Sequence, residues 1–360
     1  MTSTEPVVET TEPRSDLSMV PGVASVERET LVEHDRRTAL DGGGTYFWPD
    51  GTIGSVTGPD GTVMHFAANG SVIARTTGTA TDPSGALLDA RIEIDGVSDE
   101  FDYAAGGPVY VDPDTGDLLL WYHAERNLDG NPALFHAAIG IARSTDGGAS
   151  FSDLGIIIET NSVPNPASPC CADVGGAPMI VRDGEFHVYH RDRSGEFGLT
   201  EVQLTRSSAP VDEVLAAARA GTVSAWTKYN RREGAPALGG RGATMEVNNL
   251  KTSWFDIAWH DELGRYLMVI AVHGTLSEPS ELVMISSVDG VEWSPRQLLA
   301  ECACELTYPS ILGTVGPERL VGNELSVVAV ASDSSSTFRW ENTTVERFTM
   351  VLTGQLEASS

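Results

Sequence analysis

The fold is decided by the stretch Pro108-Val-Tyr-Val111, Asp114-Thr-Gly116, Leu118-Leu-Leu-Trp-Tyr122. Two short apolar strands around a turn that contains glycine predict a β-hairpin. Glycine suits such a turn because it adopts a positive φ without steric cost. The same pattern occurs at four more places: Thr52–Val56 with Val63–Phe66, Pro178–Val181 with Phe186–Tyr189, Phe255–Trp259 with Tyr266–Ile270, and Pro309–Leu312 with Leu325–Val328.

The spacing of these hairpins predicts an all-β, five-bladed β-propeller. The turn glycines lie roughly 55 to 80 residues apart, which suits one four-stranded blade with its loops; they are Gly61, Gly116, Gly184, Gly264 and Gly322. A pair of β-sandwiches is the competing architecture, but it needs no equivalent hairpins at near-regular spacing. We expect one propeller domain over residues 25–360. Residues 1–24 are rich in Thr, Ser, Glu and Pro, which predicts a disordered tail.

Charge limits the partners of the chain. Acidic residues outnumber basic residues 51 to 23, and the formal net charge is −28. Such a surface repels phosphate groups, so we expect neither a nucleic-acid partner nor binding to anionic lipid. No apolar run approaches the length of a membrane span, and the N-terminus shows no signal-peptide pattern. A neutral oligosaccharide or polysaccharide is compatible with this charge.

The four cysteines form two close pairs, Cys170-Cys171 and Cys302-x-Cys304. Neither pair has the spacing of a structural zinc site. The residues are either buried thiols, or Cys170 and Cys171 form a vicinal disulfide. The disulfide would favour an extracellular or cell-surface protein. The sequence predicts no required cofactor and no metal ligand set, although a structural cation such as calcium could occupy a central channel.

Two further motifs have structural interpretations. Residues Ser144 to Phe151 match the Asp-box pattern S-x-D-x-G-x-x-[FW], and Ser287 to Trp293 form a shortened version. The aspartate of such a turn can accept hydrogen bonds from the amides of its own turn, so we assign it no catalytic role. Val211–Arg219 has the periodicity of a short helix.

The topology of a propeller predicts where its site lies. Residues just before the first strand of each blade and just after the second converge on one end of the central funnel. Acidic side chains before first strands are candidate catalytic groups: Asp41, Asp50, Asp102, Asp173 and Glu305. Candidate substrate-binding residues lie at the same end: Trp48, His123, Glu125, Cys170, Cys171, His190, Arg191, Glu246 and His273.

This blade pattern resembles the five-bladed glycoside hydrolases of family 43 and of the related families 32, 68 and 117. The resemblance implies that the acid of blade one, Asp41 or Asp50, acts as base or nucleophile. It implies that Asp102 orients the site and that Asp173 is the general acid. The usual blade-three acid is Glu, so Glu246 and Glu305 are substitutes for Asp173.

The function implied by the resemblance is hydrolysis of glycosidic bonds in a neutral, furanose-containing, arabinan-like glycan, with inversion of configuration. Two alternatives stay open. A carbohydrate-binding propeller without catalysis would use the same acids as hydrogen-bond acceptors. A sialidase-like exo-glycosidase would need three converging arginines, for which the chain offers Arg75, Arg126, Arg191 and Arg241.

Overall fold

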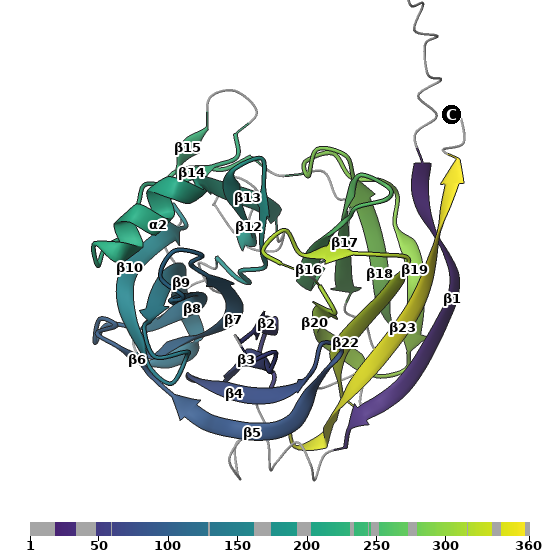
Figure 1. The fold of residues 1–360 in the computed structure, drawn as a ribbon, viewed down its shortest axis with the longest axis horizontal. Coiled ribbons are helices and arrows are strands. Elements are labelled where there is room, and N and C mark those ends of the chain that lie inside the picture. The colour runs from purple at the N-terminus through teal and green to yellow at the C-terminus, as the bar shows by residue number, and fades with distance from the viewer. Residues whose placement is uncertain are drawn as a thin grey trace, which may run out of the picture.

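The computed structural model describes residues 19–33, 48–58, 60–128, 130–161, 174–192, 203–230, 234–243, 245, 252–272, 279–314, 316–332 and 340–356. Its strands form five sheets arranged as blades around a central axis (Figure 1). The predicted five-bladed β-propeller is therefore confirmed.

Blades one and two are antiparallel meanders that run outward from the axis. Blade one contains β2 (Gly54–Thr57), β3 (Val63–Asn69), β4 (Val72–Thr79) and β5 (Asp82–Ile92). Blade two contains β7 (Tyr103–Val111), β8 (Leu118–Leu128), β9 (Asn131–Ser144) and β10 (Phe151–Glu159). The short β6 (Ile94–Asp95) follows blade one and pairs in parallel with β10, so it links the outer edges of the two blades.

Blades three and four follow the same plan. Blade three contains β11 (Met179–Arg182), β12 (Glu185–Asp192), β13 (Gln203–Pro210), β14 (Thr227–Lys228) and β15 (Ala235–Pro236). The helix α2 (Val211–Arg219) follows β13, as the sequence predicted. Blade four contains β16 (Thr252–His260), β17 (Arg265–Val272), β18 (Ser280–Ser287) and β19 (Gln297–Cys302).

Blade five closes the ring with a strand from the other end of the chain. It contains β20 (Glu305–Leu312), β22 (Glu324–Ser332) and β23 (Thr343–Leu356), with the 3₁₀-helix η1 (Trp340–Asn342) before β23. Its outer strand is β1 (Met19–Val32), which pairs antiparallel with β23 (Figure 1). Residues 19–24 thus belong to a strand, and the predicted tail boundary at residue 25 is too late.

Four of the five predicted turns have the expected backbone. Gly61, Gly116, Gly184 and Gly264 all adopt a positive φ. The prediction of a fifth tight turn was wrong. Gly322 does not adopt a positive φ, and β20 and β22 are joined by a longer connection. Within it, β21 (Leu320–Val321) pairs in parallel with β16 of blade four.

The two Asp-containing turns share one bonding pattern. Asp146 accepts hydrogen bonds from the amides of Ala149 and Ser150, and Asp289 accepts them from the two residues Val291 and Glu292. The aromatic residues that end these turns, Phe151 and Trp293, are buried. The two turns connect β9 to β10 and β18 to β19, which are the outer strands of their blades.

One cysteine pair forms a disulfide that the sequence did not predict. Cys302 and Cys304 form a disulfide at the junction of β19 and β20. Cys170 and Cys171, which the sequence suggested as a vicinal disulfide, lie outside the described residues.

Two glycines allow the inner strands of blades one and two to approach closely. A side chain at Gly54 would collide with the carbonyl of Gly107, and one at Gly107 would collide with the carbonyl of Thr52. Because only glycine tolerates this backbone contact, the inner strands of the two blades approach each other closely at these positions.

A buried ion pair joins blades four and five. Asp256 of β16 is fully buried and accepts two hydrogen bonds of 2.7 Å from the guanidinium of Arg319. The same carboxylate accepts the amide hydrogens of Ile257 and Ile311. The carboxylate is therefore satisfied only while the loop before β21 stays against β16.

This pair makes a prediction about stability. We expect Arg319→Leu to lower the free energy of unfolding by about 3–5 kcal/mol, because it leaves a buried carboxylate without its counter-ion. Chemical denaturation measures the change. Arg296→Ala, which removes an exposed partner of Glu281, serves as the control and should cost less than about 1 kcal/mol. Equal, small losses in both variants would contradict the assigned role of Arg319.

Candidate active site

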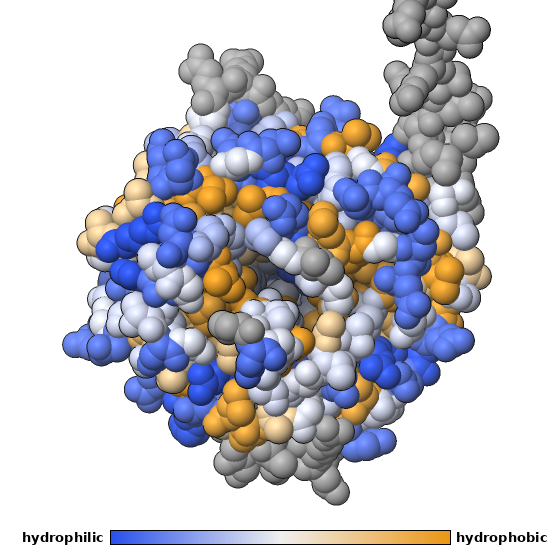
Figure 2. Space-filling model, viewed as in Figure 1, coloured by the Kyte–Doolittle hydropathy of each residue, from blue (hydrophilic) through white to orange (hydrophobic). Residues whose placement is uncertain are grey.

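A cavity of about 170 Å³ lies where the five blades meet. Figure 2 shows a hollow at the centre of this face of the molecule. The cavity is lined by Asp50 and by residues from every blade, including Tyr103, Gly176, Trp254 and Tyr308. Residues before the inner strands of several blades therefore line one cavity at the ring axis.

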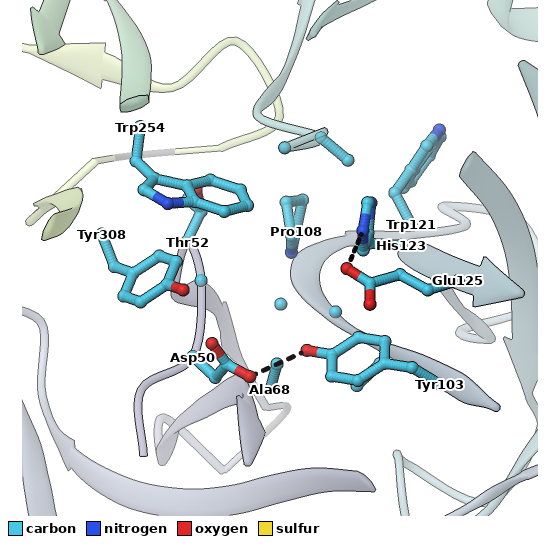
Figure 3. A pocket seen from close by; sticks show the side chains of 16 residues that line it. Asp50, Thr52, Ala68, Tyr103, Pro108, Trp121, His123, Glu125, Trp254 and Tyr308 are labelled. Atoms are coloured by element: carbon cyan, nitrogen blue, oxygen red, sulfur yellow. Dashed lines mark hydrogen bonds and ion pairs between the residues drawn. The ribbon is translucent and has the colours of Figure 1, made fainter. Parts of the chain in front are cut away.

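Asp50 is held in place by blades one, two and five. Its amide donates a hydrogen bond of 2.8 Å to the carbonyl of Ala68 on β3. Its carboxyl group accepts the hydroxyl of Tyr103 at 3.2 Å and also the hydroxyl of Tyr308. Figure 3 shows the Tyr103 contact at one wall of the cavity. Asp50 therefore has a fixed orientation before any substrate binds.

Burial sets the protonation behaviour of Asp50. Loss of solvent raises the pKa of this carboxyl group to about 6, and the nearby charge of Glu125 adds to the rise. The hydrogen bonds from Tyr308 and Tyr103 oppose it. Burial also raises the pKa of both tyrosines well above the usual value, so they remain donors. Asp50 can therefore exchange a proton close to neutral pH.

His123 and Glu125 lie on the opposite wall. They are two residues apart on β8, so both side chains leave the same face of the strand. The Nε2 atom of His123 lies 2.9 Å from Oε1 of Glu125, and Nδ1 lies 3.1 Å from the carbonyl oxygen of Val174. Figure 3 shows the carboxyl groups of Asp50 and Glu125 on different walls of one cavity.

Aromatic rings form the third wall. The rings of Trp254 and Tyr308 are 4.7 Å apart, and Tyr308 stacks on Trp340 at an interplanar angle of 12°. Arg191 lies over the Trp254 ring at 4.2 Å. Tyr308 has a φ of 51°, at an irregularity in the pairing of β20 with β22. A non-glycine residue held there is a strained position, and such strain is typical of functional sites.

Three of the predicted site residues meet in this cavity: Asp50, His123 and Glu125. Arg191 lies behind the cavity wall, over the ring of Trp254, and its charge also acts on Tyr308. Trp254 was not predicted. It stands at the start of the first strand of blade four, so the same topological rule applied to aromatic residues would have found it.

Four predicted residues lie elsewhere. Trp48 is fully buried in the core, and so is His190, whose Nε2 lies 3.0 Å from the hydroxyl of Ser207. Neither can touch a substrate in this structure. Asp102 is exposed and accepts a hydrogen bond from the amide of Asn127. It does not line the cavity, whereas the next residue, Tyr103, does. Glu305 begins β20 but does not line the cavity.

The remaining candidates cannot be placed. Asp41, Asp173, Cys170, Cys171, Glu246 and His273 lie outside the described residues. Their predicted roles stay predictions.

Within the described ranges, no group of three or more His, Cys, Asp or Glu side chains is arranged to hold a metal ion. The central cation suggested by the sequence therefore stays a prediction. In the same part of the chain, no helix has the length and hydropathy of a membrane span.

Comparisons with known proteins show the fold. No family model matches the chain, and no curated protein matches it in sequence. A protein of unknown function from Dyadobacter fermentans matches with a TM-score of 0.51 and 11% identity, over 84% of this chain and 76% of that chain.

Glycosidases are also among the similar solved structures. An α-L-arabinofuranosidase from Podospora anserina has a TM-score of 0.49 and 13% identity, over 84% of this chain and 90% of that chain. An α-L-arabinanase from Penicillium chrysogenum has a TM-score of 0.49 and 12% identity, over 83% and 92%. At these identities the likeness concerns the fold alone.

The pKa of Asp50 predicts a pH-dependent stability difference. The folded state holds its proton up to about pH 6, whereas the ordinary pKa is 3.8, so stability falls as pH rises between these values. We expect Asp50→Asn to be more stable than the unsubstituted protein at pH 7.5, by on the order of 1–3 kcal/mol.

The extra stability of Asp50→Asn should vanish below pH 3.8, because Asp50 is then protonated in both the folded and the unfolded protein. Denaturant titrations at several pH values measure it. Asp95→Asn, an exposed substitution on β6, is the matched control. A gain that does not depend on pH would show that the Asp50 carboxyl group is not the cause.

Proposed function

We propose that this protein is a glycoside hydrolase that acts on a neutral glycan. The observation that carries the proposal is the presence of two carboxyl groups, Asp50 and Glu125, on different walls of one aromatic-lined cavity. Glycosidic cleavage needs one group that protonates the leaving oxygen and one ionised carboxylate across the sugar. Two acids in unequal surroundings can supply both forms at one pH.

Asp50 is the better candidate for the ionised role. Its two tyrosine donors both favour the carboxylate, and its pKa of about 6 makes it basic enough to accept a proton from water near neutral pH. Glu125 then takes the role of proton donor. The inverting course implied by the family resemblance requires this division between a base and an acid.

The cavity suits a single sugar residue. Its volume of about 170 Å³ is below the range of pockets that hold drug-sized ligands. The rings of Trp254 and Tyr308 offer apolar surface for the C–H face of a sugar. The cavity carboxylates and the net charge of −28 disfavour uronic acids.

The finer substrate class rests on the sequence resemblance, which favours furanose-containing, arabinan-like glycans. The expected extracellular or cell-surface location would give the protein access to such polymers. A sialidase is less well supported. Arg75 donates to the carbonyl of Gly147 and Arg126 pairs with Glu100, so neither points into the cavity.

A glycan panel tests the proposal. We expect the protein to release sugar from a neutral furanose-containing oligosaccharide such as an arabino-oligosaccharide, and the first-formed product to have inverted configuration by ¹H NMR. Asp50→Asn should lower kcat/KM by about 10²–10⁴, the usual contribution of general acid–base catalysis, while ligand affinity persists.

Asp95→Asn again provides the control and should keep full activity. Binding of neutral glycans without release of product would instead support the carbohydrate-binding alternative. Release of sialic acid would support the sialidase alternative.

A further inference from the structure

The pair His123–Glu125 has a geometry that determines where one proton lies. Nδ1 of His123 lies 3.1 Å from the carbonyl oxygen of Val174. A carbonyl oxygen only accepts hydrogen bonds, so Nδ1 must carry the hydrogen. In a neutral imidazole the other nitrogen, Nε2, is then an acceptor.

Nε2 lies 2.9 Å from Oε1 of Glu125. An unprotonated Nε2 and an ionised carboxylate would place two lone pairs against each other at hydrogen-bonding distance. One additional proton between the two atoms removes this repulsion. The pair is then either a neutral histidine with a protonated glutamate, or an imidazolium with a carboxylate.

We propose that the pair His123–Glu125 stores one proton and that Glu125 delivers it to the leaving group of the glycan. This inference rests on the proposed function and names its proton donor. His123 is a positioning residue, since it fixes the Glu125 carboxyl group and holds the stored proton through its fixed tautomer.

The surroundings of the pair are compatible with this role. Tyr103 of β7 packs its ring edge-on against His123, with 5.9 Å between centroids. Asp50 faces the pair from blade one, and its charge interacts with that of both residues. Arg126, the next residue along β8, is half-buried and pairs with Glu100.

The chemical step balances with the residues present. The protonated carboxyl group of Glu125 first donates its hydrogen bond to Nε2 of His123. It then donates to the glycosidic oxygen instead. As the bond from the anomeric carbon to this oxygen breaks, its electron pair stays on the oxygen, which takes the proton. The oxygen of water bonds to the anomeric carbon, and the water proton passes to Asp50. Exchange with solvent then returns a proton to the pair and removes one from Asp50.

Leaving-group dependence tests the donor. Glu125→Gln keeps the shape of the side chain and can still donate to Nε2, but it has no acidic proton. We expect kcat/KM on an arabino-oligosaccharide to fall by about 10²–10⁴. On a 2,4-dinitrophenyl arabinofuranoside the loss should be below about tenfold, because this phenolate leaves without protonation.

Glu93→Gln, an exposed substitution near β6, is the matched control and should not change either rate. Equal losses on the two substrates would overturn the donor role of Glu125 and leave the glycosidase intact. Absence of hydrolysis of any glycan by the unsubstituted protein would overturn the proposed function and the donor role together.

A second measurement tests the stored proton without relying on turnover. In ¹⁵N NMR spectra of the His123 ring, we expect Nδ1 to be protonated in the unsubstituted protein and in the Glu125→Gln variant. Nε2 should change from a bridging environment to that of a plain acceptor in the variant. An unprotonated Nδ1 in the unsubstituted protein would overturn the inference.

Discussion

Pairing between β1 and β23 closes the ring, and the geometry of the site depends on it. The two strands come from opposite ends of the chain, and their register runs from Met19 opposite Leu356 to Val32 opposite Val345. Without β1, the edge of β23 would lie open and blade five would lack its outer strand. Closure holds the inner strands of blades one and five beside each other. The segment just before β2 supplies Asp50, and β20 supplies its hydrogen-bond partner Tyr308.

The consequence is visible at Asp50. One of its hydroxyl donors, Tyr103, comes from blade two, and the other, Tyr308, comes from blade five. Three blades surround the Asp50 carboxyl group and bury it, which raises its pKa to about 6. The two tyrosine hydroxyls still donate hydrogen bonds that favour its charged form. The close approach allowed by Gly107 brings blade two near enough for the first contact. Contacts from three blades therefore set the pKa of Asp50.

Much of this arrangement could be predicted from local sequence, since hairpin strands, turn glycines and the helix α2 depend on local periodicity. The topological rule also found Asp50, His123 and Glu125. It failed at Asp102 because strand side chains alternate, and Tyr103, one residue later, takes the inward position. The pairing of β1 was missed because its partner β23 lies at the other end of the chain, and local sequence does not reveal so distant a strand edge. Trp48 and His190 were misplaced because burial depends on packing between blades, which spacing along the chain does not reveal.

The central claim is that Asp50 and Glu125 act across one sugar ring. A crystal structure of the Glu125→Gln variant with an unhydrolysed arabino-oligosaccharide tests it most directly. We expect the anomeric carbon of the bound sugar to lie between the two side chains, with a water molecule hydrogen-bonded to Asp50 and the glycosidic oxygen beside position 125. A sugar bound with its glycosidic bond away from both side chains would contradict the account.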